Sequence, residues 1–230
     1  PNNYLMSEPE PIIGKSTNSS QIITNEINDE NSMLDIWFDR SQTQALIVQR
    51  QGKIVYERYG EDVKQGLNVN GMSMAKSVIA ILIGIAIDDE LINSEKDPIS
   101  IYLPELTSSK YNRVEIRDLL RHTSGIQSSN RDLQDTLNNK LLNLSTRDLL
   151  FSDDKSFSYD NMNYHLLMLI LQRLYQKPIN EIIEAKVWQS LRLEDASMVT
   201  SSGYCCLFAT AKSWLAIGNL FLNPNNTIVS

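Results

Sequence analysis

The hydrophobic and polar positions of this chain change character after its first thirty residues. Residues 1–30 are rich in Asn, Ser, Glu and Pro and show no apolar periodicity, which indicates an extended or partly disordered polar arm. Further on, two runs of β-forming residues, 45–48 and 54–56, flank the dipeptide Gln51-Gly52. Two such runs joined by a glycine-containing turn predict a β-hairpin.

The most apolar part of the chain is the ten-residue run 78–87, which follows a polar turn at 68–71. This run predicts a buried helix. It is about half as long as the ~20 residues that span a bilayer, and Lys76 flanks it, so we expect a core helix and no transmembrane segment.

The middle third of the chain is predicted to be mostly helical. Asp97-Pro98 and Leu103-Pro104 mark irregular connections, because proline interrupts helices and restricts the residue before it. Apolar periodicity and capping residues then predict helices at 116–121, at 146–151 with Ser145 and Asp148 spaced as a capping box, at 161–175 and at 180–189.

The last part of the chain predicts one further helix. A short apolar stretch follows Gly203, and Thr210 is a plausible N-cap. The helix after it is expected to contain Trp214, Leu215, Ile217 and Leu222.

Composition narrows the classes of function. The net charge is −7 and the lysines are scattered, so the basic stripe typical of a nucleic-acid binder is missing. Chemistry on a small molecule or a peptide is favoured instead. At 230 residues the chain can form one large domain or two small ones.

The cysteines and histidines of the chain indicate neither a disulfide framework nor a metal site. Cys205 and Cys206 are adjacent, a spacing that rarely forms a disulfide, so both are interpreted as small buried apolar residues. The chain has two histidines, His122 and His165, without a ligand-spaced Cys or carboxylate pattern. We therefore expect no zinc site and no other metal or organic cofactor.

The compartment and the oligomeric state stay open. The first residue is proline, so we expect the chain to be processed or trimmed, which leaves room for a removed signal peptide.

Candidate chemistry lies just before the apolar run, in Ser73-Met74-Ala75-Lys76. Residues three apart are neighbours on a helix, so the Ser73 hydroxyl and the Lys76 amine would share one face. A second match, Ser152-Asp153-Asp154-Lys155, lies in an acidic, turn-rich segment with no apolar run behind it. We interpret Ser152 as a solvated loop residue.

These pieces together resemble the serine β-lactamase and penicillin-binding-protein superfamily, most of all its esterase and 6-aminohexanoate-dimer hydrolase branch. The likeness runs from about residue 45 to the end. It rests on five segments, namely Gly52 to Val55, Ser73 to Ser77, Leu119 to Gly125, Tyr159-Asp160-Asn161, and Ala209 to Ala211 with the Trp214 helix.

The resemblance implies an α+β fold of the β-lactamase/transpeptidase type, an antiparallel sheet flanked by helices with an inserted helical domain. We expect the polar arm at 1–30, the first part of the α/β domain with the nucleophile helix at 31–95, the helical domain at 96–200, and a return to the α/β domain at 201–230. The family's third motif, Lys-Thr-Gly or His-x-Gly on a later strand, has no match after Trp214. We therefore expect an incomplete sheet, without the family's last strands and C-terminal helix.

The resemblance also implies a mechanism. Ser73 would attack an ester or amide carbonyl, and an adjacent base would take its proton. Lys76 could be that base or could stabilise the deprotonated form of a neighbour, and Tyr159 is the second candidate base. Asn161 would orient Lys76 or a substrate carbonyl, unless it is simply a helix N-cap. One oxyanion-hole donor can come from Ser73, and the other would belong to the missing strand.

Other interpretations remain open. Gly71 to Ala75 approaches the Gly-x-Ser-x-Gly elbow of α/β-hydrolases, in which a histidine would serve Ser73 as base. His122 and His165 are, however, expected to be structural. The other alternative is a catalytically incomplete relative that binds peptide or cell-wall-like ligands without turnover. An ester, a linear amide, a D-peptide and a β-lactam all remain possible substrates.

Overall fold

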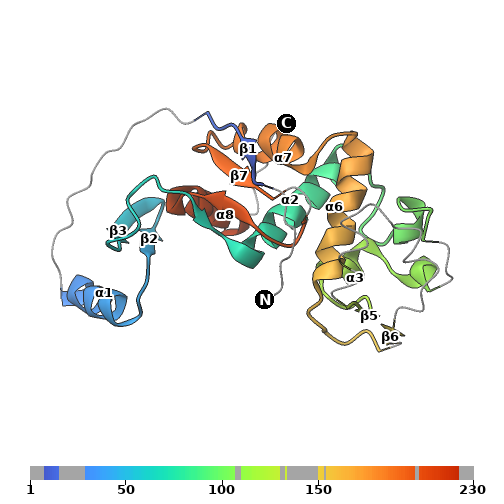
Figure 1. Cartoon of the computed structure of the whole chain (residues 1–230), viewed down its shortest axis with the longest axis horizontal. Coiled ribbons are helices and arrows are strands. Elements are labelled where there is room, and N and C mark those ends of the chain that lie inside the picture. Colours follow the sequence, from blue (N-terminus) through green and yellow to red (C-terminus); the bar gives the residue numbers. More distant parts are fainter. Residues whose placement is uncertain are drawn as a thin grey trace.

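The structure of the chain, a computed structural model, describes residues 8–15, 29–106, 110–129, 133, 150–152, 154–199 and 202–222. Helices and antiparallel strands are mixed along the chain, and the predicted α+β class is confirmed (Figure 1). Within the described residues, no helix combines the length and apolar character needed to cross a membrane.

The main sheet has four short strands in the order β1-β7-β8-β4, each antiparallel to its neighbour. The strands are β1 (Glu10–Ile12), β7 (Ala196–Met198), β8 (Leu207–Ala209) and β4 (Val69–Asn70). Strand β1 comes from the segment predicted as a polar arm. Three residues are too few to show an alternating pattern, although Ile12 is fully buried.

The predicted hairpin is confirmed as a separate two-stranded sheet, β2 (Ala45–Arg50) and β3 (Lys53–Tyr59). Gln51 and Gly52 both have a positive φ, as a tight hairpin turn requires. Helix α1 (Asp29–Arg40), which the sequence pattern did not predict, lies against this hairpin at one end of the molecule (Figure 1).

Polar contacts and one buried aromatic ring hold α1 to the hairpin. The Tyr56 hydroxyl donates to Asp35 over 2.6 Å, and Arg58 pairs with Asp35 and Asp39. Phe38 of α1 is also buried, with the Arg58 guanidinium 4.6 Å from the centre of its ring.

The core is built on two predicted helices. Helix α2 (Ala75–Asp88) follows the short 3-10 helix η1 (Met72–Met74) and buries most of its surface, with Val78, Ile79 and Leu82 wholly inaccessible. It packs against α6 (Asn161–Tyr175), whose bounds are the predicted ones. The apolar run is therefore the central core helix.

The described residues between α2 and α6 form short elements. These are η2 (Ile99–Ile101), η3 (Tyr111–Arg113), α3 (Ile116–Leu120), β5 (Ile126–Gln127) and β6 (Leu150–Phe151), with β5 and β6 antiparallel. The helix predicted at 146–151 is wrong at 150–151, which form β6. Residues 146–149 lie outside the described residues. Residues 150–151 form a strand instead of the end of a capped helix, because Ser152 N–H donates to the Gly125 carbonyl oxygen and the Phe151 ring packs edge-on against Tyr111.

The remaining helices agree with the sequence pattern. The helix predicted at 180–189 is α7 (Ile179–Ile183), continued by the π-helical turn η4 (Glu184–Trp188). Helix α8 (Ala211–Leu222) begins after Thr210, whose hydroxyl accepts from Ser213 N–H, so the predicted N-cap is confirmed. Helix α8 packs on β2, and Lys212 pairs with Glu57 of β3.

Candidate active site

Ser73 lies in a tight connection between the main sheet and the core helix. Strand β4 ends at Asn70, whose side chain accepts from Met72 N–H over 2.8 Å, and Met72 has the positive φ of 48°. Gly71 lies against Trp214 so closely that a Cβ at this position would overlap the indole ring. This connection presents the Ser73 side chain on the surface, directly before α2.

Lys76 lies one turn after Ser73 on the same helix face, as predicted. Its side chain is buried, and Nζ donates to Ser73 Oγ over 3.1 Å and to the carbonyl oxygen of Tyr204 over 2.8 Å. The rings of Tyr159, Tyr204 and Tyr164 surround Nζ, with centroids 4.9, 5.5 and 6.0 Å away. A carbonyl oxygen and aromatic faces form an environment suited to a cation.

Tyr159, the second predicted proton carrier, lies beside this lysine in the segment that leads into α6. Burial on its own would raise the pKa of the phenol. Hydrogen bonding with Lys76 and Ser73 and the positive charge of Lys76 lower it by more, so the pKa of Tyr159 is below its ordinary value. The structure thus brings Ser73, Lys76 and Tyr159 together.

Asn161 lies close by in sequence but is neither the N-cap of α6 nor a described hydrogen-bond partner of Lys76. It is the first residue of α6, and the N-cap is Asp160, whose side chain accepts from Met162 N–H over 2.8 Å. The N-cap alternative for Asn161 is therefore wrong. Among the described residues, Lys76 hydrogen-bonds with Ser73, Tyr159 and the Tyr204 carbonyl rather than with Asn161.

Asp160 is a residue that the sequence reasoning missed. Besides capping α6, it accepts from the backbone and the hydroxyl of Ser128, each over 2.7 Å. An Asp directly before an apolar helix is an N-cap signal, and that signal was assigned to Asn161 instead. The sequence could not indicate the Tyr204 carbonyl as a partner of Lys76, because every residue has a backbone carbonyl.

Ser152 and Lys155, the second match to the spacing, do not form a pair of the Ser73 kind. Lys155 donates to Asp118 over 2.8 Å, and the Ser152 hydroxyl accepts from Asp154 N–H. Ser152 follows β6 in a loop, as predicted, and is half-buried rather than fully solvated.

His122 and His165 contact aromatic side chains. The His122 ring stacks on Tyr159, and the buried His165 lies edge-on to Tyr204. The hydroxyl of Ser73 bonds Lys76 rather than His122, which opposes the α/β-hydrolase alternative.

The two cysteines agree with the expectation of small, largely buried side chains. Cys206 is buried and Cys205 half-buried. They directly follow Tyr204, the carbonyl partner of Lys76.

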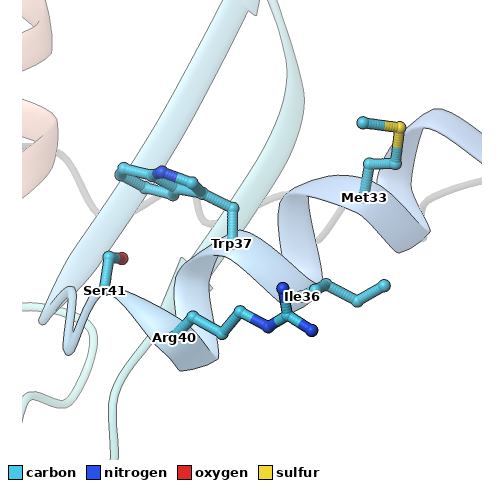
Figure 2. Close-up of a pocket in the computed structure, with 5 residues that line it drawn as sticks. All are labelled: Met33, Ile36, Trp37, Arg40 and Ser41. Carbon is cyan, nitrogen blue, oxygen red and sulfur yellow. The ribbon is translucent and has the colours of Figure 1, made fainter.

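A hollow of about 590 Å³ lies elsewhere, along α1. Figure 2 shows that its lining side chains come from α1 and the turn after it: Met33, Ile36, Trp37, Arg40 and Ser41. None of the predicted catalytic residues lines it, so it is not the candidate active site.

Comparison with known proteins identifies the family of this chain. The family model described as Beta-lactamase matches residues 39–202, which is more than half of the chain. The chain belongs to the beta-lactamase family. This result confirms the resemblance to the serine β-lactamase and penicillin-binding-protein superfamily, and the matched segment includes Ser73, Lys76 and Tyr159.

Solved structures support the same fold for this beta-lactamase-family chain. A Bacillus anthracis protein described as a 6-aminohexanoate-dimer hydrolase matches with a TM-score of 0.68 and 21% identity, over 83% of this chain and 56% of its own. FmtA from Staphylococcus aureus matches with a TM-score of 0.72 and 16% identity, over 91% and 68%. A class C beta-lactamase mutant matches with a TM-score of 0.66 and 18% identity, over 92% and 71%.

The chain thus spans between 56% and 71% of these three structures, and the identities are low enough that the likeness shows the fold alone. A search of curated proteins gave no match.

Proposed function

We propose that this protein is a serine hydrolase of the β-lactamase-related kind, which cleaves an ester or an amide through an acyl-enzyme on Ser73. The observation that carries the proposal is the buried Lys76 ammonium, 3.1 Å from Ser73 Oγ and 4.9 Å from the centre of the Tyr159 ring. A hydroxyl, a cation and a phenol with a lowered pKa are the parts that an activated serine needs.

The contacts of Lys76 and Tyr159 suggest which of the two is the general base. Lys76 donates hydrogen bonds to Ser73 and Tyr204 and is surrounded by ring faces, so it acts as a fixed positive charge. Tyr159 then takes the proton, because the cation beside it favours the phenolate. We therefore assign the role of general base to Tyr159 and the role of electrostatic partner to Lys76.

The reaction follows from these roles. The Tyr159 phenolate accepts the Ser73 proton while Ser73 Oγ forms a bond to the substrate carbonyl carbon. The resulting oxyanion accepts a hydrogen bond from Ser73 N–H, one donor of the oxyanion hole. The intermediate collapses with loss of the alcohol or amine, which takes the proton from Tyr159.

Hydrolysis of the acyl-enzyme reverses the sequence with water as nucleophile. Tyr159 accepts a proton from water, the hydroxide adds to the acyl carbon, and Ser73 leaves with the proton returned from Tyr159. Asn161, at the first position of α6, is proposed to orient the substrate carbonyl through its amide.

Turnover of chromogenic esters, linear amides and β-lactams by Ser73→Ala and Ser152→Ala tests this function. Ser152 is the matched control, because it has the same Ser-x-x-Lys spacing without the Lys76-type contact. We expect Ser73→Ala to lose at least 10³-fold in kcat/KM for the accepted class of substrate and Ser152→Ala to stay within about twofold. Binding without turnover in the unmodified protein would favour the non-catalytic alternative.

A further inference from the structure

His122 is a buried titratable residue that the proposed reaction does not use, yet it contacts the proposed base. Its imidazole ring stacks on the Tyr159 ring, with the centroids 4.4 Å apart and the planes 24° from parallel. A surface tyrosine with one ring face covered in this way loses much of its rotamer freedom.

The backbone on both sides of Tyr159 is bonded to the same histidine. Ser158 N–H donates to the His122 carbonyl oxygen over 2.8 Å, and Asp160 N–H donates to His122 Nδ1 over 3.3 Å. His122 therefore holds the residue before Tyr159, the residue after it and the Tyr159 ring.

The histidine is itself fixed by a buried hydrogen-bond chain. Asn163 Nδ2 lies 3.1 Å from His122 Nδ1, Asn163 Oδ1 accepts from Ser124 Oγ over 2.6 Å, and Ser124 Oγ accepts from Ile126 N–H. Because Nδ1 faces two donors, the ring proton lies on Nε2. A φ of 56° at His122 is a further sign that the surrounding structure imposes its conformation.

The surroundings of His122 favour the neutral imidazole that this hydrogen-bond network requires. Burial, and after it the positive charge of Lys76, lowers the pKa of His122, and the opposing effect of Asp160 is smaller. The titratable and charged groups that face His122 are Lys76 of α2, Tyr159 and Asp160 before α6, and Tyr164 on α6.

We propose that His122 is a positioning residue, which keeps the Tyr159 phenol against Lys76 and Ser73 so that its proton can be exchanged. This role rests on the proposed function. A structural role in the turn alone would lower stability when His122 is changed, but it would leave the titration of Tyr159 where it is.

His122→Asn separates these two roles. Asparagine tolerates a positive φ and retains a short side-chain acceptor, but it removes the stacked ring. Phe157→Ala is the matched control. The exposed Phe157 ring also packs on His122, with the ring centroids 5.9 Å apart, but it does not lie between His122 and Tyr159. The readouts are the thermal midpoint and the rate of fluorophosphonate labelling from pH 5 to 10.5.

We expect His122→Asn to label about 10- to 100-fold more slowly at neutral pH, with the rising limb of its pH profile moved to higher pH. Phe157→Ala should keep the parent profile. An unchanged limb in folded His122→Asn would overturn the role of His122 alone. Failure of the unmodified protein to label would instead contradict the proposed function, and the role of His122 with it.

A second measurement covers the case in which His122→Asn does not fold. On this proposal, protonation of His122 Nδ1 would remove the acceptor of Asp160 N–H, so both Tyr159 and His122 must be deprotonated for labelling. The logarithm of the labelling rate should therefore steepen from a slope of one to a slope of two below the pKa of His122. A slope of one that continues below the pKa of His122, as read from the NMR titration of its imidazole in the same protein with the fold intact by circular dichroism, would overturn the proposal.

Discussion

At the scale of single residues, the site depends on one buried charge. Lys76 reaches Ser73 Oγ, the Tyr204 carbonyl oxygen and the Tyr159 ring from a single position on α2. The spacing of Ser73 and Lys76, together with the apolar run behind them, predicted this pair, because residues three apart on a helix share a face. It could not supply the Tyr204 carbonyl or the His122 ring, which come from distant segments and depend on how the chain packs.

Lys76→Met tests the cation at this scale. Without the hydrogen bond and the charge of Lys76, only the hydrogen bond with Ser73 opposes the larger effect of burial, so the pKa of Tyr159 should rise above its ordinary value. Since the phenolate form is populated above that pKa, the rising limb of labelling or turnover should move to higher pH. Each unit of movement would mean about tenfold less activity on the acid side of the limb.

Lys155→Met is the matched control for Lys76→Met. Lys155 belongs to the second Ser-x-x-Lys stretch and pairs with Asp118 rather than with a serine. Its removal should leave the pH profile unchanged. The general-base assignment is contradicted if the Lys76→Met limb coincides with that of the parent protein.

At the scale of secondary-structure elements, the nucleophile depends on the connection between β4 and α2. The sequence predicted α2 and α6 because their apolar runs are long, and it predicted the hairpin because its turn residues are distinctive. It missed β1, which is too short for a pattern, and assigned a helix where β6 pairs with β5. Short elements are decided by tertiary pairing rather than by local preference.

Gly71→Ala tests the connection before Ser73. The added methyl group would overlap the Trp214 ring, so overpacking should cost about 1–3 kcal/mol of unfolding free energy and displace Ser73. For a chain of this size, each 1 kcal/mol lowers the thermal midpoint by about 2–4 °C. Differential scanning calorimetry and the labelling rate of the same sample measure both effects.

Gly84→Ala is the control glycine, on the exposed side of α2 with open space around its Cβ position. Alanine there should stabilise the helix by about 0.5–1 kcal/mol and leave labelling unchanged. Equal stabilities of Gly71→Ala and the parent protein would show that Trp214 does not pack against this connection as described.

At the scale of the whole molecule, distant parts of the chain meet at one site. Ser73 comes from η1, Lys76 from the first turn of α2, Tyr159 from the segment before α6, and the Tyr204 carbonyl from the segment before β8. Motif order and spacing allowed the meeting of Ser73, Lys76 and Tyr159 to be inferred from a resemblance, and the segment 39–202 that matches the beta-lactamase family contains all three. Local physical rules alone would have given the helices without their arrangement.

The most direct test is the intact mass of the protein after incubation with a fluorophosphonate, run beside Ser73→Ala and Ser152→Ala. An activated Ser73 predicts one adduct on the parent protein and on Ser152→Ala, and none on Ser73→Ala. An adduct that persists in Ser73→Ala, or none on the folded parent protein, would contradict the assignment of Ser73 as the nucleophile.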